Sequence, residues 1–177
     1  MFAFKNLDPE TYRQRTRKSS LIVIVVFAAL AMSLSSALVL IWGAPGGNNF
    51  RLNLLGVGLG AVTTVLLVRF YLGNQPFMAE ALYAWHLKRN LMRITNIMHR
   101  VRPLAESGHP RALQVLRFYH LALEQMHRLE GNDTGILELR VEKIATEQQM
   151  QTLGLDTDLQ NFDPQWLKEL SDKKAEA

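Results

Sequence analysis

The sequence predicts an all-α fold, in which a two-helix transmembrane hairpin is followed by a small helical domain. Two apolar stretches, Leu21–Trp42 and Leu52–Leu72, contain no Asp, Glu or Lys. As a helix, each stretch would span roughly the ~30 Å of a bilayer's hydrocarbon core. The residues that follow are more polar, with apolar residues three and four positions apart, a spacing typical of soluble amphipathic helices. We therefore expect membrane spans at about 21–42 and 52–72, joined by a turn over 43–51.

This change of pattern divides the chain into four parts. They are a basic cytoplasmic arm (1–19), the transmembrane hairpin (20–72), a cytoplasmic helical domain (76–170) and a flexible tail (171–177). The arm holds five Lys and Arg residues, whereas the turn holds one, Arg51. Because cytoplasmic loops carry the excess of Lys and Arg, we expect a multi-pass protein with both termini in the cytoplasm. The first apolar run is longer than the core of a secretory signal, which favours an uncleaved anchor.

Basic and aromatic residues stand near the ends of both predicted spans, where lipid headgroups would lie. Asp8 and Pro9 predict a helix that starts within the arm, with Asp8 as its N-cap. The cations that follow are expected to anchor the span, and lipid-specific docking is the alternative. The predicted membrane-interface residues are Arg13, Arg15, Arg17, Lys18, Trp42, Phe50, Arg69 and Tyr71.

Small residues recur every fourth position in both spans and therefore share one face of each helix. Such faces let membrane helices approach closely. Because the turn is short, we expect the two faces to pack against each other within one chain, with Gly60 near Ser33. A homodimer through Gly56 and Gly60 is the alternative. The predicted helix-packing residues are Ala29, Ser33, Ala37, Gly56, Gly60 and Thr64.

After Pro76 we expect a helical hairpin or three-helix bundle, with a short fourth helix. The first helix carries a heptad-like apolar seam, and Pro103 is expected to kink it near its end. The seam needs an apolar partner, either the later helices of the same chain or a second copy of the first helix. The seam residues are Leu87, Leu91, Ile94, Met98 and Val101.

Glycine and proline mark the ends of the later helices. The second helix is expected over about 110–130 and the third over about 135–153, with Thr134 as N-cap of the third. Asp163 and Pro164 then open the short last helix. The third helix is expected to direct three apolar residues inward: Leu137, Val141 and Ile144.

Charge is segregated along the helical domain. Residues 76–128 hold eight basic and three acidic residues, whereas residues 129–177 hold five basic and eleven acidic residues. In one interpretation the basic half faces the acidic half within the fold. In the other, a basic surface is attracted to anionic lipid or to an acidic partner. The two interpretations are compatible.

No motif for catalysis or cofactor binding emerges from the sequence. The chain has no cysteine, which excludes thiolate metal sites and a Cys nucleophile. His120 and His127 share a helix face but lie two turns apart, too far for joint metal ligation without a third group. The glycines at 56, 58 and 60 lie inside a span with no preceding strand, which excludes a dinucleotide fingerprint. We therefore expect no catalytic, cofactor-binding or metal site, no nucleic-acid partner and no small-molecule substrate.

Several stretches together resemble the bacterial domain-of-unknown-function family 3087. They are Asn49-Phe50-Arg51-Leu52-Asn53-Leu54, Pro76-Phe77-Met78-Ala79-Glu80, Tyr83-Ala84-Trp85-His86-Leu87-Lys88 and Phe118-Tyr119. The resemblance implies a small bacterial inner-membrane protein with two spans and a helical C-terminal part. It implies no activity.

Three functions are therefore considered. The first is a non-enzymatic, membrane-tethered helical module for protein–protein interaction or assembly, whose partners are the bilayer and another protein. The second is an auxiliary subunit of a transporter or channel. The third is an enzyme with an unrecognised site, and the absence of an acid–base cluster makes it the least favoured.

Overall fold

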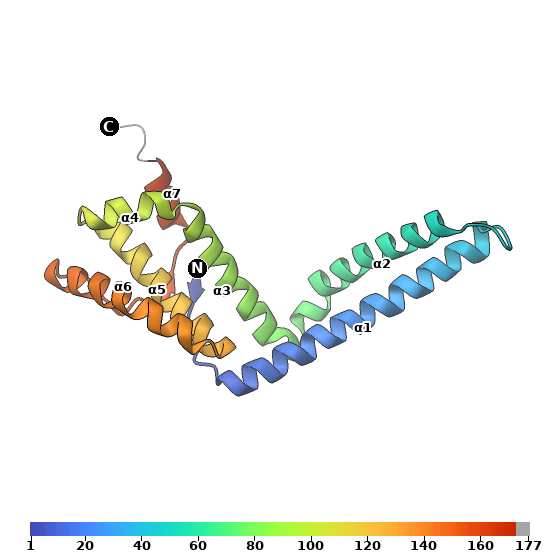
Figure 1. The fold of residues 1–177 in the computed structure, drawn as a ribbon, viewed down its shortest axis with the longest axis horizontal. Helices are drawn as coiled ribbons and strands as arrows, with labels where there is room; N and C mark the ends of the chain where they lie inside the picture. Colours follow the sequence, from blue (N-terminus) through green and yellow to red (C-terminus); the bar gives the residue numbers. More distant parts are fainter. Residues whose placement is uncertain (173–177) are drawn as a thin grey trace. The chain divides into compact units, whose positions relative to one another are not determined.

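The computed structural model describes residues 1–172 and is almost entirely helical (Figure 1). This confirms the predicted all-α class, with two membrane-length helices followed by a helical bundle. Of the predicted tail, residues 173–177 lie outside the described part, while residues 171 and 172 end the last helix. The elements are β1 (Phe2–Ala3), α1 (Pro9–Trp42), α2 (Phe50–Phe70), the 3₁₀ turns η1 (Leu72–Asn74) and η2 (Pro76–Met78), α3 (Ala79–Asn96), α4 (Met98–Glu106), α5 (Pro110–Glu130), α6 (Asp133–Thr152), β2 (Asn161–Phe162) and α7 (Gln165–Asp172).

The chain forms two compact units, which differ from the predicted division. Residues 14–82 form a hairpin unit, while residues 1–13 and 83–177 are grouped as a helical unit. The predicted arm is therefore not a separate part. Asp8 caps α1 as predicted, since its Oδ2 accepts a hydrogen bond of 2.8 Å from the Thr11 N–H. From there α1 runs without a break to Trp42, so it belongs to both units.

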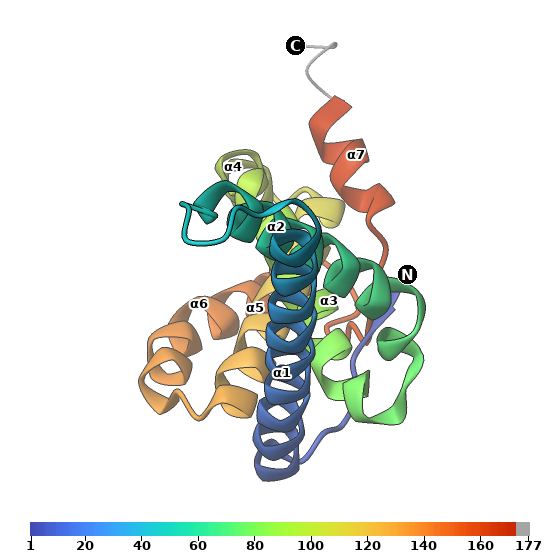
Figure 2. The same ribbon diagram turned by 90° about the vertical axis from the view of Figure 1, so that its right-hand side faces the viewer.

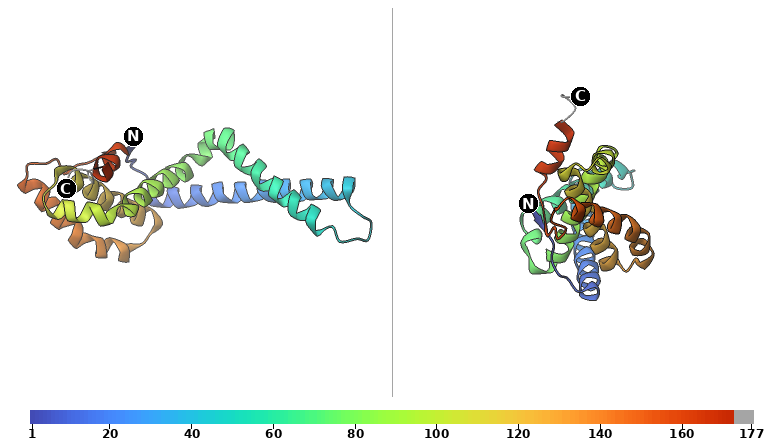
Figure 3. Two further views of the ribbon diagram at one scale, coloured as in Figure 1. Left: turned by 90° about the horizontal axis from the view of Figure 1, so that it is seen from above. Right: turned by 90° about the vertical axis from the view of Figure 1, so that its left-hand side faces the viewer.

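In the hairpin unit, α1 and α2 run side by side in opposite directions and are joined by the turn 43–49 (Figures 1 and 3). Helix α2 starts at Phe50, two residues before the predicted start. Both long helices have the length and composition needed to cross a membrane. Only 6% of the most apolar window of the first helix and 17% of that of the second are buried. A core helix of a soluble protein would be mostly buried, and these two are not.

In the helical unit, the predicted seam forms part of the chain's own core. Leu87, Leu91, Ile94 and Val101 are buried, and Met98 packs against them. The seam is therefore covered within one chain. The first helix breaks at Ile97, between α3 and α4, and Pro103 lies inside α4. The break lies six residues before the proline, whereas the carbonyl that Pro103 leaves without a donor is that of His99, so the break is not where the proline was expected to kink the helix.

Helices α5 and α6 lie side by side and pack extensively (Figure 2). Helix α5 runs from Pro110 to Glu130 and is capped by Gly131, whose φ of 74° is the left-handed conformation that glycine adopts without strain. The predicted N-cap of the third helix is wrong. Asn132 rather than Thr134 caps α6, because its side chain accepts the N–H of Gly135 at 3.1 Å.

The first residues of the chain pair with residues near its end. Phe2 pairs with Phe162 in a short antiparallel ladder of β1 and β2. The rings of Phe2, Phe4 and Phe162 then surround Phe118 on α5, with the Phe118–Phe162 centroids 4.5 Å apart. The sequence does not predict this pairing, because strands of two residues have almost no periodic pattern.

Candidate functional site

The hairpin is closed by the small residues of α2. Gly56, Gly60 and Thr64 are the buried residues of this helix. A Cβ added to Gly56 would lie 2.4 Å from Ser35 Cα, and one added to Gly60 would lie 2.7 Å from Ala31 Cα. The two backbones therefore approach too closely for any side chain at these positions.

The predicted face of α1 is wrong. Ala29, Ser33 and Ala37 are exposed, and Gly60 lies against Ala31 rather than Ser33. Ala31 and Ser35 are also small and four residues apart, so α1 offers two such faces. A shift of two residues turns a helix by about 200°, which points the predicted face away from α2.

The predicted membrane-interface residues separate into two groups. Arg13 belongs to the helical unit, where its guanidinium donates to the Leu129 carbonyl at the C-terminal end of α5. A cation is favourable there because the last carbonyls of a helix lack intrahelical donors. Arg15 instead pairs with Glu80 at 2.6 Å within the hairpin unit. The remaining six are exposed: Arg17, Lys18, Trp42, Phe50, Arg69 and Tyr71.

Helix α6 presents an apolar stripe to the outside, which overturns the predicted inward direction. Leu137 is 65% exposed, Val141 75% and Ile144 47%. The opposite face, with Leu139, Thr146 and Met150, is buried instead. We call Leu137, Val141 and Ile144 the α6 stripe. Since they lie four and three residues apart, they form one continuous surface of a kind that commonly marks a docking site.

A buried histidine lies between α4, α5 and α6. The His120 side chain is 1% exposed, and neither ring nitrogen has a hydrogen-bond partner among the described residues. Its Nε2 lies 3.5 Å from Glu142 Oε2, and Arg102 donates to the same carboxylate at 3.2 Å. These three residues line a hollow of about 220 Å³, which Glu106 on α4 and Thr146 and Gln149 on α6 also line. Burial lowers the pKa of the His120 imidazole, and the Glu142 carboxylate opposes that effect.

The position of His120 predicts that acid destabilises the helical unit. Its pKa is lower in the folded than in the unfolded chain, so stability is full above the unfolded value near 6.5 and falls as pH drops towards the folded value. Because a single proton is bound, the unfolding free energy changes by at most about 1.4 kcal/mol per pH unit. His120→Gln should flatten the pH dependence of thermal unfolding between about pH 6.5 and 5, above the range where carboxylates titrate. His99→Gln, at an exposed position, is the control. Equal flattening by both variants would contradict the prediction.

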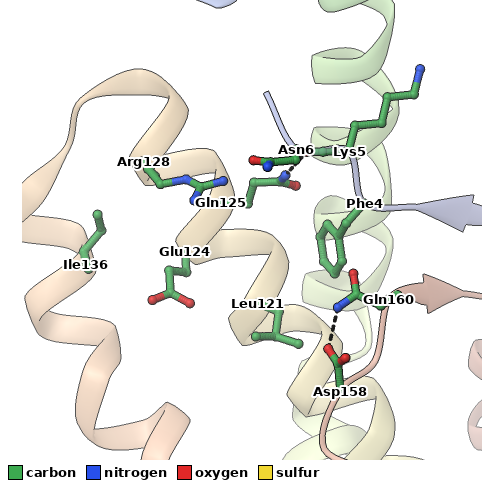
Figure 4. A pocket seen from close by; sticks show the side chains of 10 residues that line it. All are labelled: Phe4, Lys5, Asn6, Leu121, Glu124, Gln125, Arg128, Ile136, Asp158 and Gln160. Carbon is green, nitrogen blue, oxygen red and sulfur yellow. Dashed lines mark hydrogen bonds between the residues drawn. The ribbon is translucent and has the colours of Figure 1, made fainter. Parts of the chain in front are cut away.

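A second hollow, of about 570 Å³, lies where the first residues of the chain meet α5 and α6 (Figure 4). Its charged lining is already paired in part. Lys143 binds Glu124 at 2.6 Å, and Gln160 donates to Asp158. Gln125 donates to the Lys5 carbonyl at 2.7 Å and accepts from the Tyr83 hydroxyl. These bonds hold residues 4–6 against α3 and α5, so the polar groups around the hollow stabilise the fold.

The comparison with family models decides the family. The model described as "Protein of unknown function (DUF3087)" matches residues 2–167. The chain belongs to this family. The match includes both membrane-length helices and most of the helical unit, and it confirms the resemblance seen in the sequence. No curated protein and no solved structure matches this DUF3087 chain.

Within this DUF3087 chain, the structure brings two features into view that sequence patterns missed. The sequence pattern predicts that the α6 stripe faces inward, and it considers His120 only as a metal ligand paired with His127. No sequence signal predicts the environment of His120, because the residues around its unpartnered ring nitrogens come from α4 and α6, which are distant in the sequence. Among the described residues, no group of three or more His, Asp or Glu is arranged to hold a metal ion.

Proposed function

We propose that this protein is a non-enzymatic, membrane-anchored helical module that docks another protein through the α6 stripe. The exposure of Leu137, Val141 and Ile144 is the observation that carries the proposal. Three adjacent aliphatic side chains in water are costly, and a partner surface that covers them recovers the transfer free energy. The non-enzymatic role is supported by the lack of a recognisable catalytic motif in the sequence.

We further propose a bacterial inner-membrane location, with both termini and the helical unit in the cytoplasm. The two exposed, membrane-length helices support an anchor. Five cations before the first apolar run against one in the turn support this orientation. The charges beside the α6 stripe are mixed, with Glu138 and Arg140 both exposed, which favours a protein partner over an anionic lipid surface.

The test is a pull-down from native membranes with stripe variants of the full chain. Leu137→Asp together with Ile144→Asp should remove any specifically bound protein, since an anchor residue is typically worth about 2 kcal/mol or more at an interface. The thermal unfolding of the variant should stay nearly unchanged because these positions are exposed. Glu138→Ala with Arg140→Ala is the matched control and should retain the partner.

Two outcomes would contradict the proposal. One is a partner that binds the stripe variant as well as the unchanged chain. The other is a reversed orientation. Because the chain has no cysteine, Val141→Cys provides a unique thiol, and a reagent that cannot cross membranes should label it only when the cytoplasmic side is opened.

An auxiliary subunit of a transporter or channel is the second candidate. One observation favours it: Ala29, Ser33 and Ala37 form a small-residue face of α1 that α2 leaves exposed. Such a face fits a transmembrane helix of another protein. If this candidate holds, Ser33→Leu, rather than the stripe variant, should release the co-purifying protein.

A further inference from the structure

We propose that the exposed face of α3 docks on the anionic headgroups of a lipid bilayer. This face, which we call the basic α3 face, consists of Trp85, Arg89, Met92 and Arg93. The inference rests on the proposed membrane anchoring and adds a second, peripheral contact with the same membrane.

The helical pattern places these four residues on one side of α3. Arg89 lies four residues after Trp85 and four before Arg93, and Met92 lies three after Arg89, so they are neighbours on the helix surface. All four are exposed, and Met92 is 67% and Trp85 51% exposed despite being large and apolar. The opposite side of the same helix supplies Leu87, Leu91 and Ile94 to the core. The core packing therefore sets which side of α3 faces outward.

The charged residues along this stretch of the chain have one sign. Residues 81–105 contain five Lys and Arg residues and no Asp or Glu. Three of these cations have partners in the fold: Lys88 pairs with Glu130, Arg102 with Glu142, and Arg100 donates to the Ser171 carbonyl. Arg89 and Arg93 form no ion pair with any described residue. They are left to attract anions from outside the fold.

The aromatic part of the face fits the headgroup region. The Arg89 guanidinium lies over the Trp85 ring, 4.8 Å from its centroid. A tryptophan with an apolar ring and a polar N–H is most stable at a membrane–water interface, and a neighbouring arginine reaches phosphate oxygens there. Met92 adds an apolar side chain that the same interface covers.

Chain connectivity supports lipid rather than another class of partner. Only ten residues, 75–84, separate the second membrane-length helix from Trp85, so a membrane crossed by that helix is within reach. A lipid surface presents many phosphates at high density, and each Lys or Arg near an anionic surface adds about a fivefold preference for binding it. The α6 stripe lacks this basic excess, which distinguishes the two surfaces.

The experiment uses the full chain with a single spin label at Met92→Cys, which is feasible because the chain has no cysteine. The protein is reconstituted into vesicles of phosphatidylcholine alone or of phosphatidylcholine with phosphatidylglycerol. Collisions of the label with oxygen and with a water-soluble nickel chelate report its depth. A label at Val141→Cys on the α6 stripe is the control position.

In vesicles with phosphatidylglycerol, we expect the label at 92 to be shielded from nickel and accessible to oxygen, whereas the label at 141 stays in water. Arg89→Gln with Arg93→Gln should lower the ratio of docked to undocked protein about fivefold for each arginine. Arg140→Gln, on α6, should leave it unchanged.

Each other result contradicts the inference in its own way. Flotation in a density gradient shows whether the protein is bound to the vesicles. Protein that floats with neither kind of vesicle contradicts both the membrane anchoring and the α3 contact. Protein that floats with the label at 92 in water overturns the α3 contact alone. If the label at 92 is shielded equally in both kinds of vesicle, anionic headgroups have no role in the contact. If only the label at 141 is shielded, the basic α3 face is not the surface that contacts the membrane.

Discussion

Phe118→Ala should lower the unfolding free energy of the helical unit by about 3–5 kcal/mol, a large fraction of what a domain of this size has. Phe118 is fully buried on α5 and stacks on Phe162 and Phe4, with centroids 4.5 and 5.1 Å away. Truncation removes these ring contacts and leaves a cavity that rigid helices cannot close.

Chemical unfolding of the full chain, followed by helical circular dichroism, measures this loss. Met92→Ala is the control, because that side chain is largely exposed and its removal should change stability by less than about 0.5 kcal/mol. Phe118→Ala should also speed hydrogen exchange at Phe4, whose N–H bonds to the Gln160 carbonyl. A loss below about 1 kcal/mol, or unchanged exchange at Phe4, would show that the aromatic cluster does not hold the two ends of the chain.

Gly56→Ala and Gly60→Ala should each push α1 and α2 apart, at a cost of about 1–2 kcal/mol in helix association. The new Cβ would lie 2.4 Å from Ser35 Cα or 2.7 Å from Ala31 Cα, and both are backbone atoms that cannot rotate away. Leucine at either position should separate the helices further. Gly58→Ala is a matched control, since a Cβ there meets nothing within 4 Å.

Spin labels at Val25→Cys and Val65→Cys, both exposed and on different helices, measure the separation by pulsed dipolar spectroscopy. We expect longer distances for the variants at 56 and 60 and an unchanged distance for the variant at 58. Equal effects at all three positions would contradict the assigned packing face. If dipolar coupling is instead observed between spin labels on two chains, and is lost in the variants at 56 and 60, these glycines belong to a dimer interface.

Sequence patterns that involve only residues close together in the chain predicted the order and the ends of most helices. The two uninterrupted apolar runs predicted the long helices, because a helix satisfies its backbone hydrogen bonds within a single segment. Pro110 and the left-handed Gly131 bound α5 as expected, since each acts through its own φ. The seam of the first helix after Pro76 was predicted because its apolar residues recur at spacings of three and four along one face.

The sequence by itself therefore determined the class, the two long helices and most helix ends, while the tertiary structure decided which faces meet. Helix α1 has two small-residue faces and α6 has two apolar faces, so periodicity cannot choose between Ser33 and Ala31, or between Val141 and Met150. That choice depends on how the whole surface of one helix fits the next, as with Gly60 against Ala31. The pairing of Phe2 with Phe162 and the burial of His120 likewise depend on residues far apart in the chain, whose interactions exist only once the fold has brought them together.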